Sequence, residues 1–269
     1  MRQNRSYRLL ITNGFRQLFL LLFVLAGAQT HAQIMIGGNV YGGGNAGDTG
    51  GNTTVTVRAG DLNRVYGGAR MADVGGRAFM HIDGANASDY IVINRLYGGN
   101  DIAGTIGTSE EDLPDVIQEH AEANHVDKTW NALVLISTKT NADGTEAADA
   151  QKIYIGQLFG GGDGEYVYGS RTEDAKTVYY AEEDGVEVAT SSTELTAPNL
   201  GKTFVDIHGG SIVYAYGGGN AATVTEKTVI RVDNPSRVVN SIVDATNPNA
   251  GTGGELLTTD RFRTISLRI

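Results

Sequence analysis

The sequence predicts an all-β fold, in the form of a repeat-built β-solenoid that resembles a right-handed parallel β-helix. Three observations predict it. Glycine accounts for 37 of the 269 residues, about twice its usual share of ~7%. An aromatic residue followed by two glycines recurs five times. The segments around these motifs alternate apolar and polar residues with the period of two that is typical of half-buried strands.

The first 32 residues have the composition of a cleaved secretory signal peptide. Four arginines lie before an apolar run at 18–26, and small residues then offer cleavage sites after Ala28 or after Ala32, of which we prefer the second. The apolar run has nine residues, whereas a transmembrane helix needs ~20. We therefore expect an exported protein without a transmembrane span in its mature chain. It would lie outside the cell or on the outer cell surface, with the periplasm as a further compartment.

The composition excludes several classes of function. Cleavage removes four of the 21 basic residues and none of the 31 acidic ones, so the mature net charge is 17 − 31 = −14. This charge repels phosphate, and we expect neither nucleic acid nor an anionic membrane surface as a partner. The chain has no cysteine, which excludes disulfides, thiolate metal sites and a cysteine nucleophile.

The aromatic–glycine motifs are the predicted corners of the repeat. Successive aromatic residues are 25, 31, 62 and 57 positions apart, and the two long intervals are close to twice the short ones. We assign these motifs a structural role and no catalytic, cofactor-binding or metal-binding role. They are Tyr41, Gly42 and Gly43; Tyr66, Gly67 and Gly68; Tyr97, Gly98 and Gly99; Phe159, Gly160 and Gly161; and Tyr216, Gly217 and Gly218.

Each repeat unit contains two predicted strands separated by a glycine corner. Residues 53–68 align without a gap to residues 203–218. Such a unit buries its one apolar face by stacking on its neighbours at ~4.8 Å per coil. Stacking in register would place the five aromatic residues in one column. A β-sandwich or prism is the alternative, because antiparallel strands produce the same alternation.

The first of two insertions, at about 100–131, contains a predicted helix at 109–125 within the repeat domain at 33–250. Ser109 is the expected helix cap. One face of the helix would carry Leu113, Val116, Ile117, His120 and Ala121. His120 and His125 do not share a face, and we expect both to be solvated.

The second insertion, at about 163–202, contains a predicted β-hairpin. Asp184 and Gly185 lie between two strand-like segments and would form its turn. A further hairpin is predicted near 141–144. Residues 251–269 are expected to be an irregular tail, and the chain is expected to be a truncated piece of a longer protein because no capping element follows the repeats.

Two sets of polar side chains are candidates for chemistry. The pairs His81/Asp83 and Asp206/His208 occupy equivalent strand positions and would suit an acid–base or metal row, although neighbouring copies carry other residues. Corner oxygens could bind Ca²⁺, but such residues more often hydrogen-bond turn backbone; they belong to Asn45, Asn100, Asp163 and Asn220. We expect no cofactor, with Ca²⁺ as the alternative.

Two further motifs have structural explanations. Residues 42–47 match the glycine pattern of dinucleotide-binding loops, but a strand-like segment follows them where that fold requires a helix. Aromatic residues could stack on sugar rings, although aromatics in hairpins usually pack across strands; they are Trp130, Tyr166, Tyr168, Tyr179 and Tyr180.

Four segments resemble the units of large, secreted, glycine-rich repeat proteins of Gram-negative anaerobic bacteria. They read VYGGGNAG at 40–47, RLYGGND at 95–101, LFGGGDGEYVYG at 158–169 and GGSIVYAYGGGN at 209–220. The resemblance implies a surface or extracellular location. It implies no catalytic residues and no specific activity.

We therefore expect a secreted or cell-surface repeat protein with a structural or adhesive role and no catalysis. Its partner would be an extracellular glycan or protein, recognised by the insertions at 100–131 and 163–202. The alternative is a carbohydrate-binding or polysaccharide-acting β-helix protein. Self-association is a further expectation, because the end coils of a stack expose strand edges.

Overall fold

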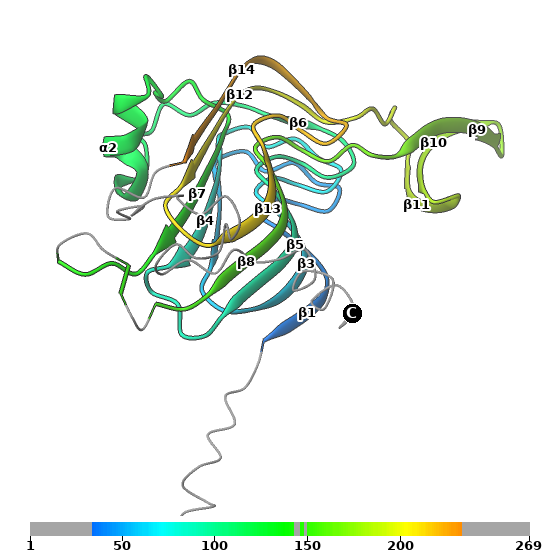
Figure 1. Cartoon of the computed structure of the whole chain (residues 1–269). Coiled ribbons are helices and arrows are strands. Elements are labelled where there is room, and N and C mark those ends of the chain that lie inside the picture. Colours follow the sequence, from blue (N-terminus) through cyan, green and yellow to red (C-terminus); the bar gives the residue numbers. More distant parts are fainter. Residues whose placement is uncertain (1–33, 143–145, 148–149, 233–269) are drawn as a thin grey trace, which may run out of the picture. The chain divides into compact units, whose positions relative to one another are not determined.

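A computed structural model of the chain describes residues 34–142, 146–147 and 150–232. This part of the chain is all-β except for one helix, and it contains two large parallel sheets and one small antiparallel sheet (Figure 1). The predicted signal peptide at 1–32 and the predicted tail at 251–269 lie outside the described residues. So does the tip of the hairpin predicted near 141–144.

The first large sheet, sheet A, contains one strand from each copy of the aromatic–glycine motif. Its strands run in the order β1, β3, β5, β8 and β13, and every neighbouring pair is parallel. The bounds are β1 Met35–Tyr41, β3 Gly60–Tyr66, β5 Ile91–Tyr97, β8 Ile153–Phe159 and β13 Ser211–Tyr216. The order across the sheet is therefore the order along the chain.

The second large sheet, sheet B, contains most of the intervening strands. Its order is β2, β4, β7, β12 and β14, with the short β6 paired to β12, and all of its pairs are parallel. The bounds are β2 Thr53–Val57, β4 Ala78–Gly84, β6 Thr105–Ile106, β7 Ala132–Thr138, β12 Asn199–Ile207 and β14 Thr223–Val232. The period-two pattern did not distinguish parallel from antiparallel pairing, and in both large sheets the pairing is parallel.

The glycine corners extend the parallel ladder of sheet A beyond its strands. The amide of Gly42 donates to the carbonyl of Tyr66 at 3.1 Å, and that of Gly67 donates to the carbonyl of Tyr97 at 2.8 Å. A β-carbon at Gly67 would lie less than 3.0 Å from the carbonyl oxygen of Gly98. These corner glycines do not have positive φ angles. The repeat needs glycine here because neighbouring corners approach closely, not because of the turn conformation.

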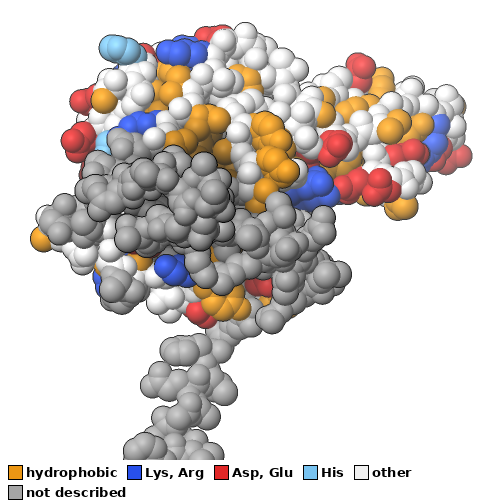
Figure 2. Space-filling view, viewed as in Figure 1, with side chains coloured by type: hydrophobic (Ala, Val, Ile, Leu, Met, Phe, Trp, Pro, Cys, Tyr) orange, Lys and Arg blue, Asp and Glu red, His pale blue; other side chains and the backbone are white. Residues whose placement is uncertain are grey.

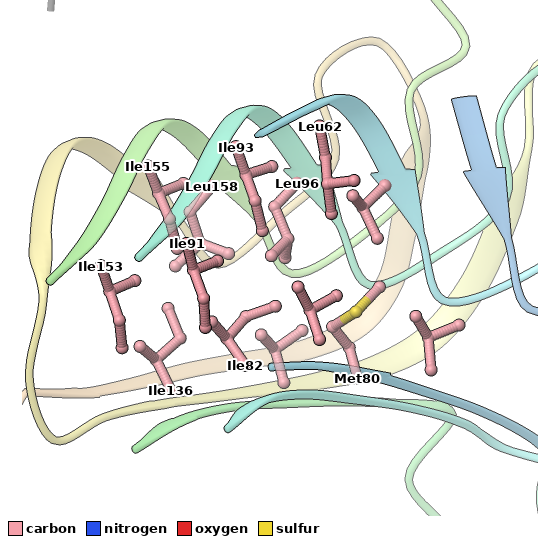
Figure 3. Close-up of a cluster of buried hydrophobic side chains, with 14 of the residues drawn as sticks. Leu62, Met80, Ile82, Ile91, Ile93, Leu96, Ile136, Ile153, Ile155 and Leu158 are labelled. Atoms are coloured by element: carbon pink, nitrogen blue, oxygen red, sulfur yellow. The ribbon is translucent and has the colours of Figure 1, made fainter. Parts of the chain in front are cut away.

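The main core fills the space between sheets A and B. Strands of both sheets point apolar side chains into it, so Leu62, Ile93 and Ile155 lie side by side in sheet A while Met80 and Val134 are adjacent in sheet B. Figure 3 shows the labelled side chains of the two layers pointing toward one another. In sheet B the residues of this core alternate along the strand, as Met80 and Ile82 do, whereas in sheet A Leu62 and Val65 are three residues apart.

The helix in the first insertion, α2, spans Asp115–Ala123 and begins directly after Pro114. Ile117 and Ala121 are buried in a cluster on the outer face of sheet B. The expected cap is wrong, because Pro114 occupies the N-cap position and no side chain caps the helix. The structure removes Val116 from the face predicted to carry it: this side chain is 56% exposed, since it lies one residue, or 100°, away from Ile117 around the helix.

The second insertion forms a three-stranded antiparallel sheet, β11-β10-β9. Its strands are β9 Val167–Glu173, β10 Lys176–Glu183 and β11 Val186–Ser191. Asp184 and Gly185, at φ 53° and 76°, turn between β10 and β11 as the sequence predicts. The strand β9 was not predicted, because its turn uses Asp174 and Ala175 at positive φ, and alanine rarely adopts that conformation.

Candidate functional site

The five aromatic residues of the repeat form one continuous stack. Neighbouring ring centroids are 4.8–5.0 Å apart and the interplanar angles are 4–13°. Tyr66 and Tyr97 are fully buried, whereas Tyr216 at one end of the stack is 44% exposed. The rings pack against one another at the spacing of the strands, so the interior of the stack has a structural role.

Two buried carboxylates lie beside this aromatic stack. Asp101 accepts hydrogen bonds from the hydroxyls of Tyr41 at 2.6 Å and Tyr166 at 2.5 Å. Asp163 accepts one from Tyr66 at 3.0 Å. Both aspartates are 1% exposed. Burial raises the pKa of Asp101, and the tyrosine hydrogen bonds only partly offset that effect.

The corner residues considered as Ca²⁺ ligands bond to other groups of the chain. The Asn100 amide group bonds to backbone groups of residues 69, 72 and 103 at 2.8–3.3 Å. Asp163 also accepts from Asn220 at 3.0 Å, and Asn45 accepts from Arg70 at 3.0 Å. Their amide and carboxylate groups bond to turn backbone and to neighbouring side chains, as is usual for Asn and Asp in turns.

A groove of about 560 Å³ lies between sheet A and the antiparallel sheet. Sheet A contributes Arg64 and Arg95, and the opposite wall includes Glu165, Tyr166 and Glu183. Arg64 forms an ion pair with Glu183 at 2.6 Å, and Arg95 approaches Glu165 at 3.6 Å. Figure 2 shows basic and acidic side chains together where the antiparallel sheet meets the rest of the described chain. The groove therefore offers cationic, anionic and aromatic groups to a ligand.

A second polar cluster lies between α2 and sheet B. His120 Nδ1 is 3.0 Å from Asp206 Oδ2, and His208 Nε2 is 2.8 Å from the same oxygen. Arg231 lies 2.9 Å from the other oxygen of Asp206. Burial would raise the pKa of Asp206, but its hydrogen bonds with His208 and Arg231 outweigh burial and lower it. His120 is partly solvated, with its side chain 33% exposed, and its ring also stacks on His208 at 4.3 Å.

The structure does not bring the two predicted His/Asp pairs together. β7 lies between β4, which carries His81 and Asp83, and β12, which carries Asp206. Asp83 bonds to Arg58 at 2.7 Å, and His81 bonds to Ser137 at 2.9 Å. Burial lowers the pKa of His81, which favours its neutral form. The two pairs are separate polar clusters on one face of sheet B.

The other sequence candidates take structural positions. The glycine segment 42–47 is followed by β2 and not by a helix. Trp130 is 2% exposed and packs edge-to-face on Phe204 at 6.3 Å, so it is not available to stack on a sugar. Tyr166, Tyr168 and Tyr179 pack against a small apolar cluster beneath the antiparallel sheet.

Comparisons with protein-family models, with curated proteins and with solved structures give no match for this chain. Among the described residues, no helix is long and apolar enough to cross a membrane. Sequence reasoning missed the contact of His120 with Asp206, which lie 86 positions apart, and the opposition of Arg64 and Glu183 across the groove. No local pattern in the sequence indicates either pairing.

Proposed function

We propose that this chain is an exported repeat protein of the β-solenoid type, with a structural or adhesive role and no catalysis. Support for the solenoid comes from strands that alternate between two parallel sheets and from corners that stack strand upon strand. The tyrosines of the aromatic stack and the two buried aspartates hydrogen-bond to one another, which supports a structural rather than a chemical role. The secretory features of residues 1–32 and the acidic composition support export.

We place the binding surface at the groove between sheet A and the antiparallel sheet. The main observation behind this proposal is that hydrogen bonds fix the antiparallel sheet beside the two arginines of sheet A, Arg64 and Arg95. Tyr168 donates to the carbonyl of Ile102 at 2.6 Å, and Arg70 donates to the carbonyl of Val188 at 2.5 Å. These bonds hold the groove walls before a ligand arrives, which lowers the entropic cost of binding.

The partner of this groove would be an extracellular polymer, a glycan or a protein, that offers hydrogen-bonding groups of both kinds. Arg95 and Glu165 are its most accessible charged pair, with side chains 30% and 63% exposed. Arg64 and Arg95 lie on neighbouring hydrogen-bonded strands of sheet A, which give the groove a rigid base. Rigid elements position binding groups more accurately than free loops do.

The test is a binding screen of the secreted protein against immobilised extracellular glycans and matrix proteins. We expect saturable binding that Arg95→Ser with Glu165→Gln weakens at least tenfold. Arg171→Ser is the matched control, since Arg171 is a charged residue of the same insertion that pairs with Glu173 and Glu187 outside the groove. Binding that survives the groove variant, or no binding to either panel, would contradict the proposal.

A carbohydrate-binding or polysaccharide-acting protein is the second candidate. The groove favours it because guanidinium, carboxylate and phenol groups all bond sugar hydroxyls, and all three line the groove. A glycan array tests binding, and the release of reducing ends from polysaccharides tests hydrolysis. Glycan binding without the release of reducing ends would support an adhesive role. No signal in either assay would exclude this candidate.

A further inference from the structure

The cluster between α2 and sheet B brings three metal-ligating atoms together. His120 Nδ1, Asp206 Oδ2 and His208 Nε2 all lie within 4.8 Å of one another. Asp206 is fully buried, and the two histidine side chains are 33% and 17% exposed. His120 lies on α2, Asp206 lies near the end of β12, and His208 directly follows that strand.

The hydrogen bonds within this cluster cannot all be satisfied at once. Arg231 Nη1 lies 3.0 Å from His208 Nε2, and a guanidinium only donates, so this contact needs an unprotonated nitrogen. The same nitrogen lies 2.8 Å from Asp206 Oδ2, and that contact needs a proton on it. If His208 Nε2 is protonated, two donors face one another at Arg231; if it is unprotonated, two acceptors face one another at Asp206. With the nitrogen unprotonated, its lone pair and that of the carboxylate point into the same space.

We propose that His120, Asp206 and His208 bind a divalent transition-metal ion, of which Zn²⁺ is the representative. An ion at this point would accept the three lone pairs and leave Arg231 bonded to the other oxygen of Asp206. Two imidazoles and one carboxylate form a donor set that Zn²⁺ favours, with water at the fourth position. Imidazole nitrogen is a poor ligand for Ca²⁺, which prefers oxygen.

Two of the three spacings are close to those of a zinc site, and the third, between the two imidazole nitrogens, is within 4.8 Å. Zn–N and Zn–O bonds of about 2.0–2.1 Å in a tetrahedron hold ligand atoms roughly 3.3 Å apart. The distances from Asp206 Oδ2 to the two imidazole nitrogens, 3.0 and 2.8 Å, need only a small expansion. His120 can provide it by tilting out of its stack on His208, which also turns its in-plane lone pair toward the ion, because its side chain is the most exposed of the three. The bound ion would attach α2 to sheet B.

The test is titration of the tag-free protein with ZnCl₂ and with CaCl₂ by isothermal calorimetry. We expect one Zn²⁺ site per chain and no Ca²⁺ binding at this cluster. His120→Ala should weaken Zn²⁺ binding at least tenfold, whereas His125→Ala and His81→Ala, the matched histidine controls, should leave it unchanged. Circular dichroism verifies that His120→Ala folds, and this residue, whose side chain is a third exposed, makes a safer variant than the buried Asp206.

A second variant separates a metal site from a simple polar network. Arg231→Gln removes a positive charge that opposes the ion, so we expect it to bind Zn²⁺ as tightly as the native protein or more tightly. The inference is overturned if Zn²⁺ gives no saturable binding. It is equally overturned if His120→Ala binds Zn²⁺ like His125→Ala, because the bound ions would then be adventitious.

Discussion

The hydroxyl of Tyr66 donates a hydrogen bond to the carboxylate of Asp163, which lies 97 positions further along the chain. Tyr66 ends β3, and Asp163 follows the corner after β8, two strands away in sheet A. The bond therefore joins the aromatic stack to a corner that is not its immediate neighbour. The stack therefore links non-adjacent coils by a hydrogen bond, in addition to packing neighbouring rings on one another.

Tyr66 and Tyr97 provide a matched pair of substitutions for this bond. Tyr66→Phe removes a donor from the buried Asp163, and we expect a loss of about 1–3 kcal/mol in the free energy of unfolding. Tyr97→Phe should cost less, because the Tyr97 hydroxyl makes no hydrogen bond of ordinary length among the described residues and only lies near Arg95 and Asp163. Urea denaturation measures both. Equal losses in the two variants would show that the hydrogen bond contributes nothing.

The close approach of the corners predicts unequal effects at equivalent glycines. A β-carbon at Gly99 would lie 2.7 Å from the amide nitrogen of Gly162, whereas one at Gly218 meets nothing within 4 Å in the described part of the chain. We expect Gly99→Ala to destabilise the fold by about 1–3 kcal/mol through overpacking. Gly218→Ala, at the same repeat position, should change stability by less than about 0.5 kcal/mol. The melting temperatures of both variants measure these changes. A Gly99→Ala variant as stable as the native protein would contradict the packing of the corners.

Asp101 predicts a pH dependence of stability with a defined sign. Burial raises the pKa of Asp101 in the folded state above its ordinary value of ~3.9, so the folded state binds this proton more tightly than the unfolded state does. The contribution of Asp101 to stability is therefore largest below about pH 4 and falls as the pH rises toward the raised pKa. Subtracting the stability of Asp101→Asn from that of the native protein, at several pH values, isolates this contribution. A difference that grows with pH would contradict the assignment.

Local patterns predicted the strands that contain the repeat but not the contacts between insertions and sheets. The alternation around Val55 and Val205 marks which residues enter the core, because side-chain direction along a strand has a fixed period. No local pattern predicts the burial of Trp130. An aromatic residue in an insertion has the same sequence context whether it lies on the surface or, as here, packs under the helix against Phe204.

The polar clusters were beyond local prediction for a similar reason. His120 was placed on a helix, and Asp206 and His208 on a strand, but their meeting depends on how α2 lies on sheet B. The helix lies there because Ile117 and Ala121 pack on an apolar cluster that includes Leu133 and Phe204. Such a match between distant apolar faces has no signature at either segment alone.

Stacking of the repeats in register is the central claim, and engineered cysteines test it most directly because the chain has none of its own. Asn94 donates to Asn63 on the neighbouring strand at 3.2 Å, and parallel neighbours about 4.8 Å apart suit a disulfide. Asn63→Cys with Asn94→Cys should form a disulfide on mild oxidation, detected by gel mobility and mass spectrometry. Asn63→Cys with Gln157→Cys, two strands apart, should not. A first pair that stays reduced, or two pairs that oxidise alike, would contradict the stacking.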